Sequence, residues 1–82
     1  MSDLTQVFKQ VSEVFALKLG VPSSELLPEL PLNKLLLDSL DFLELVVTLE
    51  QTFDLNINDQ AFASCTTLAD IATIIKHELS GL

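Results

Sequence analysis

The first part of the chain has apolar residues at the three- and four-residue spacing that forms one face of a helix. These positions are Leu4, Val7, Phe8, Val11, Val14 and Phe15. Ser2 or Asp3 can cap the beginning of this helix, and Gly20 followed by Pro22 ends it. The pattern therefore predicts a first helix from about Asp3 to Leu19.

Prolines interrupt the pattern after this helix. Pro22, Pro28 and Pro31 exclude a long helix between residues 21 and 37, although residues 23 to 26 can form a single turn. Leucines are frequent in the same stretch, which predicts that the loop is held against the core. They are Leu26, Leu27, Leu30, Leu32 and Leu35.

A second helix is predicted from about Ser39 to Phe53, and it has two apolar faces when its residues are placed at roughly 100° intervals. The face expected to join the core consists of Phe42, Leu45, Val46, Leu49 and Phe53. The outer strip, on nearly the opposite side, consists of Leu40, Leu43 and Val47, with Glu44 and Glu50 at its edges and Asp41 beyond Glu44. An apolar strip bordered by acids is typical of a docking surface. The alternative, a helix buried on both sides, needs more surrounding chain than this sequence has.

A short helix is predicted from Asp59 to Ala63, directing Phe62 inward, and a final helix begins at the Thr67–Asp70 capping box. Its apolar face consists of Leu68, Ile71, Ala72, Ile75 and Leu79, and Gly81 follows its end. Short connections favour an all-α fold, a small antiparallel bundle of three main helices plus one short helix. The predicted core consists of Phe8, Val11, Phe15, Val46, Leu49, Phe53, Phe62, Ile71 and Ile75.

The composition supports one folded domain over residues 1–82, because 49% of the residues are apolar. The chain has 12 acidic and 4 basic residues, a formal charge of −8, and no base between Lys34 and Lys76. Such a surface repels nucleic acid and anionic lipid, so the expected partners are proteins with basic patches. Neither a signal peptide nor a membrane-spanning stretch is evident. We expect a cytoplasmic monomer that does not insert into a membrane.

Asp54, Asn56 and Asn58 alternate as the first ligands of a calcium-binding EF-hand loop do. The sixth position of such a loop requires glycine and the twelfth glutamate, but here they are Asp59 and Cys65. We therefore predict no metal site, and a loop or capping role for these residues. Cys65 is the only cysteine, which excludes an internal disulfide, and we interpret it as a small apolar core residue.

Asp38-Ser39-Leu40 places a serine hydroxyl at the N-terminus of the second helix. Asp38 is the expected N-cap, and Asp41 is the acid at the third helical position. A catalytic serine needs a base and oxyanion donors, but the chain has no Gly-x-Ser-x-Gly motif and its one histidine, His77, lies near the far end. A helix N-terminus does favour an attached phosphodiester. We therefore interpret Ser39 as a site of modification and predict no catalytic residue. The alternative is a simple helix start.

Three runs of the sequence resemble the acyl carrier proteins, and the similarity extends over nearly the whole chain: Leu37–Asp41, Leu43–Val46 and Leu49–Asp54. The resemblance implies that a phosphopantetheinyl transferase attaches the 4′-phosphopantetheine arm of coenzyme A to Ser39, and that acyl groups ride on this arm as thioesters. It also implies a non-enzymatic carrier that serves an acyl-loading ligase or transferase and synthase or ketosynthase-type enzymes. The recognition residues it implies are Asp38, Leu40, Asp41, Glu44, Val47 and Glu50, and Leu43 joins them through its place on the outer strip.

The chain departs from the family pattern at Lys34 and Leu36, where a typical member has Asp and Gly, and at Gln51 and Thr52, where acids are usual. The loop that contains the first two positions is therefore expected to be unusual. Phe42 occupies a position that is often filled by a small residue. We hypothesise that it narrows the acyl-sheltering cavity, so that short or polar acyl groups are presented better than long fatty chains.

The sequence leaves the pathway open between fatty-acid, polyketide and other specialised synthesis. Leu35–Ser39 also resembles the approach to the serine in D-alanyl carrier proteins, so an aminoacyl cargo is one alternative. Another is an unmodified acidic helical domain that binds a partner through the outer strip. Covalent modification of Ser39 distinguishes both kinds of carrier from this last possibility.

Overall fold

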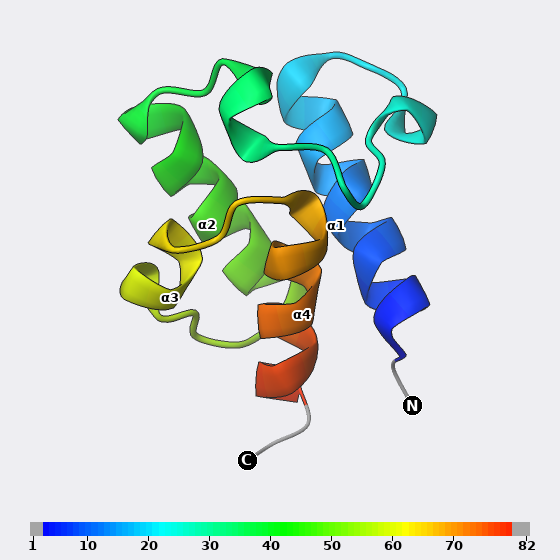
Figure 1. Ribbon diagram of the computed structural model, residues 1–82. Helices are drawn as coiled ribbons and strands as arrows, with labels where there is room; N and C mark the ends of the chain where they lie inside the picture. Colours follow the sequence, from blue (N-terminus) through cyan, green and yellow to red (C-terminus); the bar gives the residue numbers. More distant parts are fainter. Residues whose placement is uncertain (1–2, 80–82) are drawn as a thin grey trace.

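The computed structural model describes residues 3–79, apart from the side chain of Asp59, and this part of the chain is all-α. Its elements are α1 (Leu4–Leu19), η1 (Ser23–Glu25), η2 (Leu32–Leu35), α2 (Ser39–Phe53), α3 (Asp59–Ala63) and α4 (Leu68–Leu79). Helix α1 packs against both α2 and α4, which run in the direction opposite to α1, while the short α3 lies beside α4 (Figure 1). The predicted bundle of three main helices plus one short helix is confirmed.

The ends of α1 follow the predicted stop and start signals. The Asp3 carboxylate accepts a hydrogen bond of 2.9 Å from the backbone N–H of Gln6. Ser2, the other candidate cap, lies outside the described residues. At the other end, Gly20 has a φ of 72° and its N–H donates to the Ala16 carbonyl at 2.8 Å. A left-handed residue satisfies this orphan carbonyl, and glycine adopts that conformation without steric strain.

Helix α4 begins at the predicted capping box. The Asp70 N–H donates to the Thr67 hydroxyl at 3.3 Å, while the Asp70 carboxylate accepts from the N–H groups of Thr66 and Thr67 and from the Thr66 hydroxyl. The backbone hydrogen bond from Thr66 is the largest cause that lowers the pKa of Asp70, since it stabilises the charged form. Gly81, the predicted end signal, lies outside the described residues.

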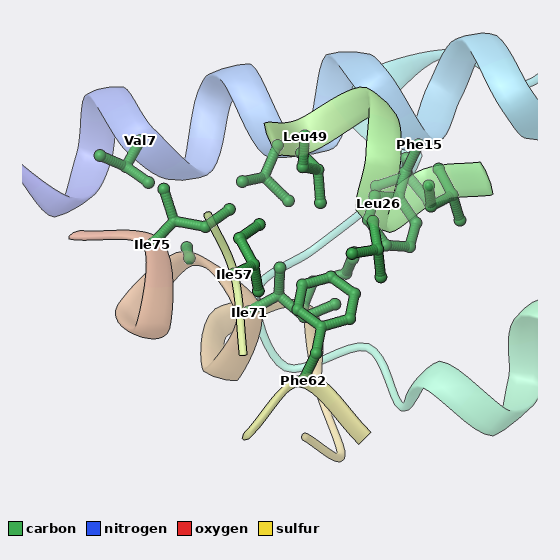
Figure 2. Packing of buried hydrophobic residues seen from close by; sticks show 13 residues of the cluster. Val7, Phe15, Leu26, Leu49, Ile57, Phe62, Ile71 and Ile75 are labelled. Carbon is green, nitrogen blue, oxygen red and sulfur yellow. The ribbon is translucent and has the colours of Figure 1, made fainter. Parts of the chain in front are cut away.

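The core joins side chains from α1, α2 and α4 with others from the loops and α3. Its buried members are Val7, Val11, Phe15, Leu26, Leu45, Val46, Leu49, Ile57, Phe62, Leu68, Ile71, Ala72 and Ile75. Figure 2 shows Val7 near Ile75 at one end of this cluster and Leu26 near Phe15 at the other. The prediction was wrong in placing Phe8 and Phe53 inside. Both are only partly buried and pack against the cluster. Phe53 is the last residue of α2, and Phe8 lines a hollow at the surface together with Leu4 and Pro28.

The loop between α1 and α2 is fastened to the beginning of α4. The Leu32 N–H donates to Thr66 O at 2.9 Å, the Ala69 N–H to Pro28 O at 2.9 Å, and the Leu68 N–H to Leu30 O at 3.4 Å. The loop is therefore ordered by main-chain bonds as well as by apolar contacts.

The leucines of this loop do not all contribute equally. Leu26 is buried, and Leu30, Leu32 and Leu35 pack partly buried against the cluster, as predicted. Leu27 is 52% exposed, so its predicted contact with the core was wrong. Leu26 and Leu27 are neighbours outside a helix, and such neighbours point to different sides of the chain.

Candidate functional site

Ser39 is the first residue of α2, and a reciprocal cap fixes its position. The Asp41 N–H donates to Asp38 Oδ1 at 2.8 Å, and the Asp38 N–H donates to Asp41 Oδ2 at 3.5 Å. The predicted capping roles of Asp38 and Asp41 are confirmed. Ser39 itself is exposed, and it stands where the backbone N–H groups of the first turn carry partial positive charge. The arrangement offers the serine hydroxyl to solvent at a place that favours an anion.

Leu36 explains why the loop before Ser39 is unusual. Its φ is 56° and its ψ is 38°, which is the left-handed region, and its side chain is 91% exposed. A residue with a Cβ is strained there by roughly 1–2 kcal/mol. The backbone has thus kept a conformation that suits the Gly of the family pattern, although this chain has leucine at that position.

An apolar cavity opens beside Ser39, between α2 and α3. Its volume is about 270 Å³, and its lining residues are Ser39, Phe42, Leu43, Val46, Phe62 and Ala63. The rings of Phe42 and Phe62 meet here, with centroids 5.0 Å apart and planes tilted by 47°. Phe42 is only partly buried, so it lies at the edge of the core and forms part of the cavity wall.

The outer strip of α2 is open to solvent, as predicted. Leu40 is 63% exposed, Leu43 52% and Val47 44%. The alternative of a helix buried on both sides is therefore wrong.

The strip is wider than the sequence pattern indicated, because α1 contributes to it. A groove of about 680 Å³ between the two helices is lined by residues of both, including Val14, Leu17, Lys18, Leu43, Val47 and Thr48. Leu17 is 86% exposed, and the sequence analysis missed it because it lies outside the core face of α1. Its spacing of three residues from Val14 was the signal that could have placed it beside the groove.

Lys18 of α1 reaches the acids of α2. Its Nζ lies 3.3 Å from Asp41 Oδ1 and is hydrogen-bonded to the Glu44 carboxylate. The hydrogen bond to Glu44 raises the pKa of Lys18 above its ordinary value, and Asp41 adds to the increase. The sequence analysis noted only that no base lies between Lys34 and Lys76. It did not predict this contact, because Lys18 lies on another helix.

Glu50 has a local partner as well. Its Oε2 accepts a hydrogen bond of 2.8 Å from the Ile57 N–H, and the residue is only partly exposed. This contact ties the end of α2 to the loop that follows. Glu50 was predicted to contact partner proteins, but its carboxylate therefore also stabilises the fold.

The comparisons with known proteins agree on one family. Residues 9–75 match the family model described as "Phosphopantetheine attachment site". An acyl carrier protein of Rubrobacter xylanophilus is 32% identical over 78 residues, covering 93% of this chain and 96% of the relative. An acyl carrier protein of Trieres chinensis is 37% identical over 79 residues, covering 95% of this chain and 96% of the relative. The chain belongs to the acyl carrier protein family.

Members of this family are non-catalytic carriers whose cofactor is covalent 4′-phosphopantetheine. His77 is exposed in the last turn of α4, and α4 ends on the side of the bundle away from the beginning of α2 (Figure 1). His77 therefore lies in the part of α4 that points away from the beginning of α2.

Cys65 of this carrier is a weak nucleophile. It is partly buried, its Sγ lies 3.6 Å from the Ala61 carbonyl, and burial together with Asp70 raises the pKa of its thiol to about 11. Because the thiolate is the reactive form, the raised pKa lowers the reactivity of the thiol at neutral pH. Cys65 packs partly buried against the core beside α3, in agreement with its interpretation as a small packing residue.

Two of the three EF-hand-like residues of this carrier are helix caps. Asp54 ends α2 with a φ of 55° and its N–H donates to Glu50 O. The Asn58 side chain caps α3 by accepting from the N–H groups of Gln60 and Ala61, at 2.8 and 3.3 Å. The predicted capping role is confirmed for these two residues.

Over residues 3–79, no helix is long and apolar enough to cross a membrane.

Proposed function

We propose that Ser39 carries the 4′-phosphopantetheine arm and that acyl groups travel on its terminal thiol as thioesters. The observation that supports this most is the exposed Ser39 hydroxyl, held as the first residue of α2 by the reciprocal cap of Asp38 and Asp41. In the attachment, the Ser39 oxygen attacks the phosphorus next to pantetheine in coenzyme A. The new phosphodiester replaces the pyrophosphate bond, adenosine 3′,5′-bisphosphate leaves, and the transferase takes the hydroxyl proton.

The surroundings of Ser39 suit such a group. The phosphodiester is an anion, and the N-terminus of α2 favours negative charge through its dipole and its unpaired N–H groups. The apolar cavity beside Ser39 offers cover for the beginning of an acyl chain. The arm supplies the thiol that forms the thioester, while the chain's own residues hold and orient the arm.

Intact mass spectrometry tests the attachment. The purified protein is incubated with coenzyme A, magnesium and a broad-specificity phosphopantetheinyl transferase, beside Ser39→Ala and the control Ser24→Ala, which alters another exposed serine. We expect the parent and Ser24→Ala to gain one phosphopantetheinyl group and Ser39→Ala to gain none. If a folded parent gains nothing, or if Ser39→Ala is modified equally well, the attachment site proposed here is wrong.

We further propose that partner enzymes dock on the outer strip of Leu40, Leu43 and Val47 and on the neighbouring carboxylates of Asp38, Asp41 and Glu44. The exposure of the three apolar side chains supports this, because exposed apolar groups rimmed by acids fit enzymes with basic patches. These partners are the transferase, an acyl-loading ligase or transferase, and synthase or ketosynthase-type enzymes. Glu50 has a smaller part in docking, since its carboxylate is bonded to Ile57.

The cargo that fits best is a short or polar acyl group, including an aminoacyl group. The support is the contact of Phe42 with Phe62, which puts two rings in the wall of the cavity next to the attachment site. The test compares the carrier loaded with butyryl and with hexadecanoyl groups. We expect the hexadecanoyl chain to change few core chemical shifts and to remain open to a thioesterase. Strong core shifts and protection of the long chain would contradict this.

A further inference from the structure

The first two acids after Ser39 share one basic partner from another helix. Asp41 and Glu44 are three residues apart on α2, so they lie on the same face. Lys18 of α1 spans both, at 3.3 Å from Asp41 Oδ1 and hydrogen-bonded to Glu44. Two of the carboxylates nearest the serine are therefore not simply a pair of free negative charges.

Lys18 belongs to the surface that a partner meets. It lines the groove between α1 and α2 together with Leu17, Leu43 and Val47, which are exposed. The Lys18 side chain is 31% exposed, and those of Asp41 and Glu44 are 36% and 53% exposed. An enzyme that approaches these carboxylates must therefore pass close to the lysine that already occupies them.

We propose that Lys18 is a specificity-determining residue, an internal counter-ion that occupies Asp41 and Glu44 in the free carrier and that a partner's lysine or arginine must displace. This inference rests on the proposed docking function of α2. A partner gains less from a base opposite these two acids than the formal charge of −8 suggests. Enzymes that rely on the apolar strip are favoured over enzymes that rely on charge alone.

The expected effect is modest, because the ion pairs are solvent-accessible. Exposed ion pairs change equilibria by up to roughly fivefold. Removing Lys18 should therefore strengthen docking about two- to fivefold, and salt should reduce the gain since it screens the bared acids. If Lys18 merely ties α1 to α2, its removal would instead lower stability and leave docking unchanged or weaker.

The main experiment compares Lys18→Gln with Lys9→Gln in the transferase reaction. Lys9 is an exposed lysine about two and a half turns earlier on α1. Each variant removes one lysine, so both change the net charge equally. We expect kcat/KM for phosphopantetheinyl transfer to rise about two- to fivefold more in Lys18→Gln than in Lys9→Gln at low salt. Equal values, or a lower value for Lys18→Gln, would overturn the inference. Circular dichroism and thermal melts verify that both variants are folded.

A double-mutant cycle sharpens the result. In the parent, Glu44→Gln removes an acid that Lys18 already satisfies, so its effect on kcat/KM should be small. In the Lys18→Gln background the same change should reduce kcat/KM by a larger factor, because Glu44 is then available to the enzyme. Equal effects in the two backgrounds would contradict a masking role.

A second measurement needs no transferase. An octalysine peptide is titrated into each variant while the backbone amide signals of Asp41 and Glu44 are followed by NMR. We expect the dissociation constant at these residues to be several-fold lower for Lys18→Gln than for Lys9→Gln, and equal constants would overturn the inference. The peptide titration measures the masking of Asp41 and Glu44 by Lys18 without the arm. A parent that gains no phosphopantetheinyl group would therefore count against the proposed function and not against this inference.

Discussion

The two faces of α2 carry similar apolar residues, but these residues have different roles. Leu45 and Leu49 are buried in the core cluster, whereas Leu43 and Val47, on the same helix, are exposed. Burial of a leucine stabilises the fold, but an exposed leucine contributes little until another molecule covers it. Residue type alone therefore says nothing about role here, and the angular position on the helix decides it.

The largest expected effect comes from truncating the buried face. Leu49 is fully buried, so Leu49→Ala should reduce the free energy of unfolding by about 2–5 kcal/mol through lost burial and a cavity. The control is Leu43→Ala on the outer strip, which should change stability by less than about 0.5 kcal/mol. Urea denaturation measures both. Similar losses at the two positions would erase the distinction between the faces.

Phe42 is a partly buried residue of the inner face that lines the cavity beside Ser39, and its truncation tests what this wall does. Phe42→Ala should reduce the free energy of unfolding by about 1–3 kcal/mol, because the ring is partly buried and contacts Phe62. Phe53→Ala removes another partly buried ring of α2 that does not line the cavity beside Ser39.

Both phenylalanine variants should melt earlier, and only Phe42→Ala should increase the protection of a hexadecanoyl thioester from a thioesterase. Equal protection in the two variants would show that Phe42 does not limit the cavity.

A gain in stability is expected in the loop that leads into α2. Leu36 is left-handed and 91% exposed, so Leu36→Gly should relieve strain without losing burial and stabilise the protein by about 0.5–1 kcal/mol. Leu27→Gly, at an exposed leucine whose φ is not positive, should be neutral or destabilising. Thermal melts compare them, and a loss of stability in Leu36→Gly would contradict the strain.

The smallest effect concerns an acid that serves the fold, in contrast to those on the docking side of α2. Hydrogen bonds from Thr66 and Thr67 lower the pKa of Asp70 below its ordinary value of 3.8. The stabilising contribution is therefore complete above that value and is lost as the pH falls through the lowered pKa. Asp70→Asn should melt earlier than the parent at neutral pH, and the difference should shrink well below pH 3.8. A gap that is constant with pH would contradict this.

The helix boundaries followed from the sequence because their causes are local. The cap of Asp38 and Asp41 spans three residues, and the apolar periodicity of α2 needs only its own turn geometry. The departure at Leu36 from the glycine of the family pattern came from the resemblance, and the positive φ there gives this departure a physical meaning.

The rest depends on which segments the fold brings together. Lys18 reaches Glu44 across 26 residues, and Phe42 meets Phe62 across 20. Glu50 accepts from Ile57 only because the chain turns after α2. Such contacts have no periodicity, so the pattern of a single helix could identify the acids of the outer strip but not their partners.

The high pKa of the Cys65 thiol has a consequence for the cargo. Exchange of a thioester onto another sulfur needs that sulfur as a thiolate, and a thiol with a pKa of about 11 is almost wholly protonated at neutral pH. The small thiolate fraction of Cys65 therefore slows the transfer of an acyl group from a thioester onto this sulfur. Burial of the cysteine thus lowers the chance that the fold itself becomes an acceptor for the cargo.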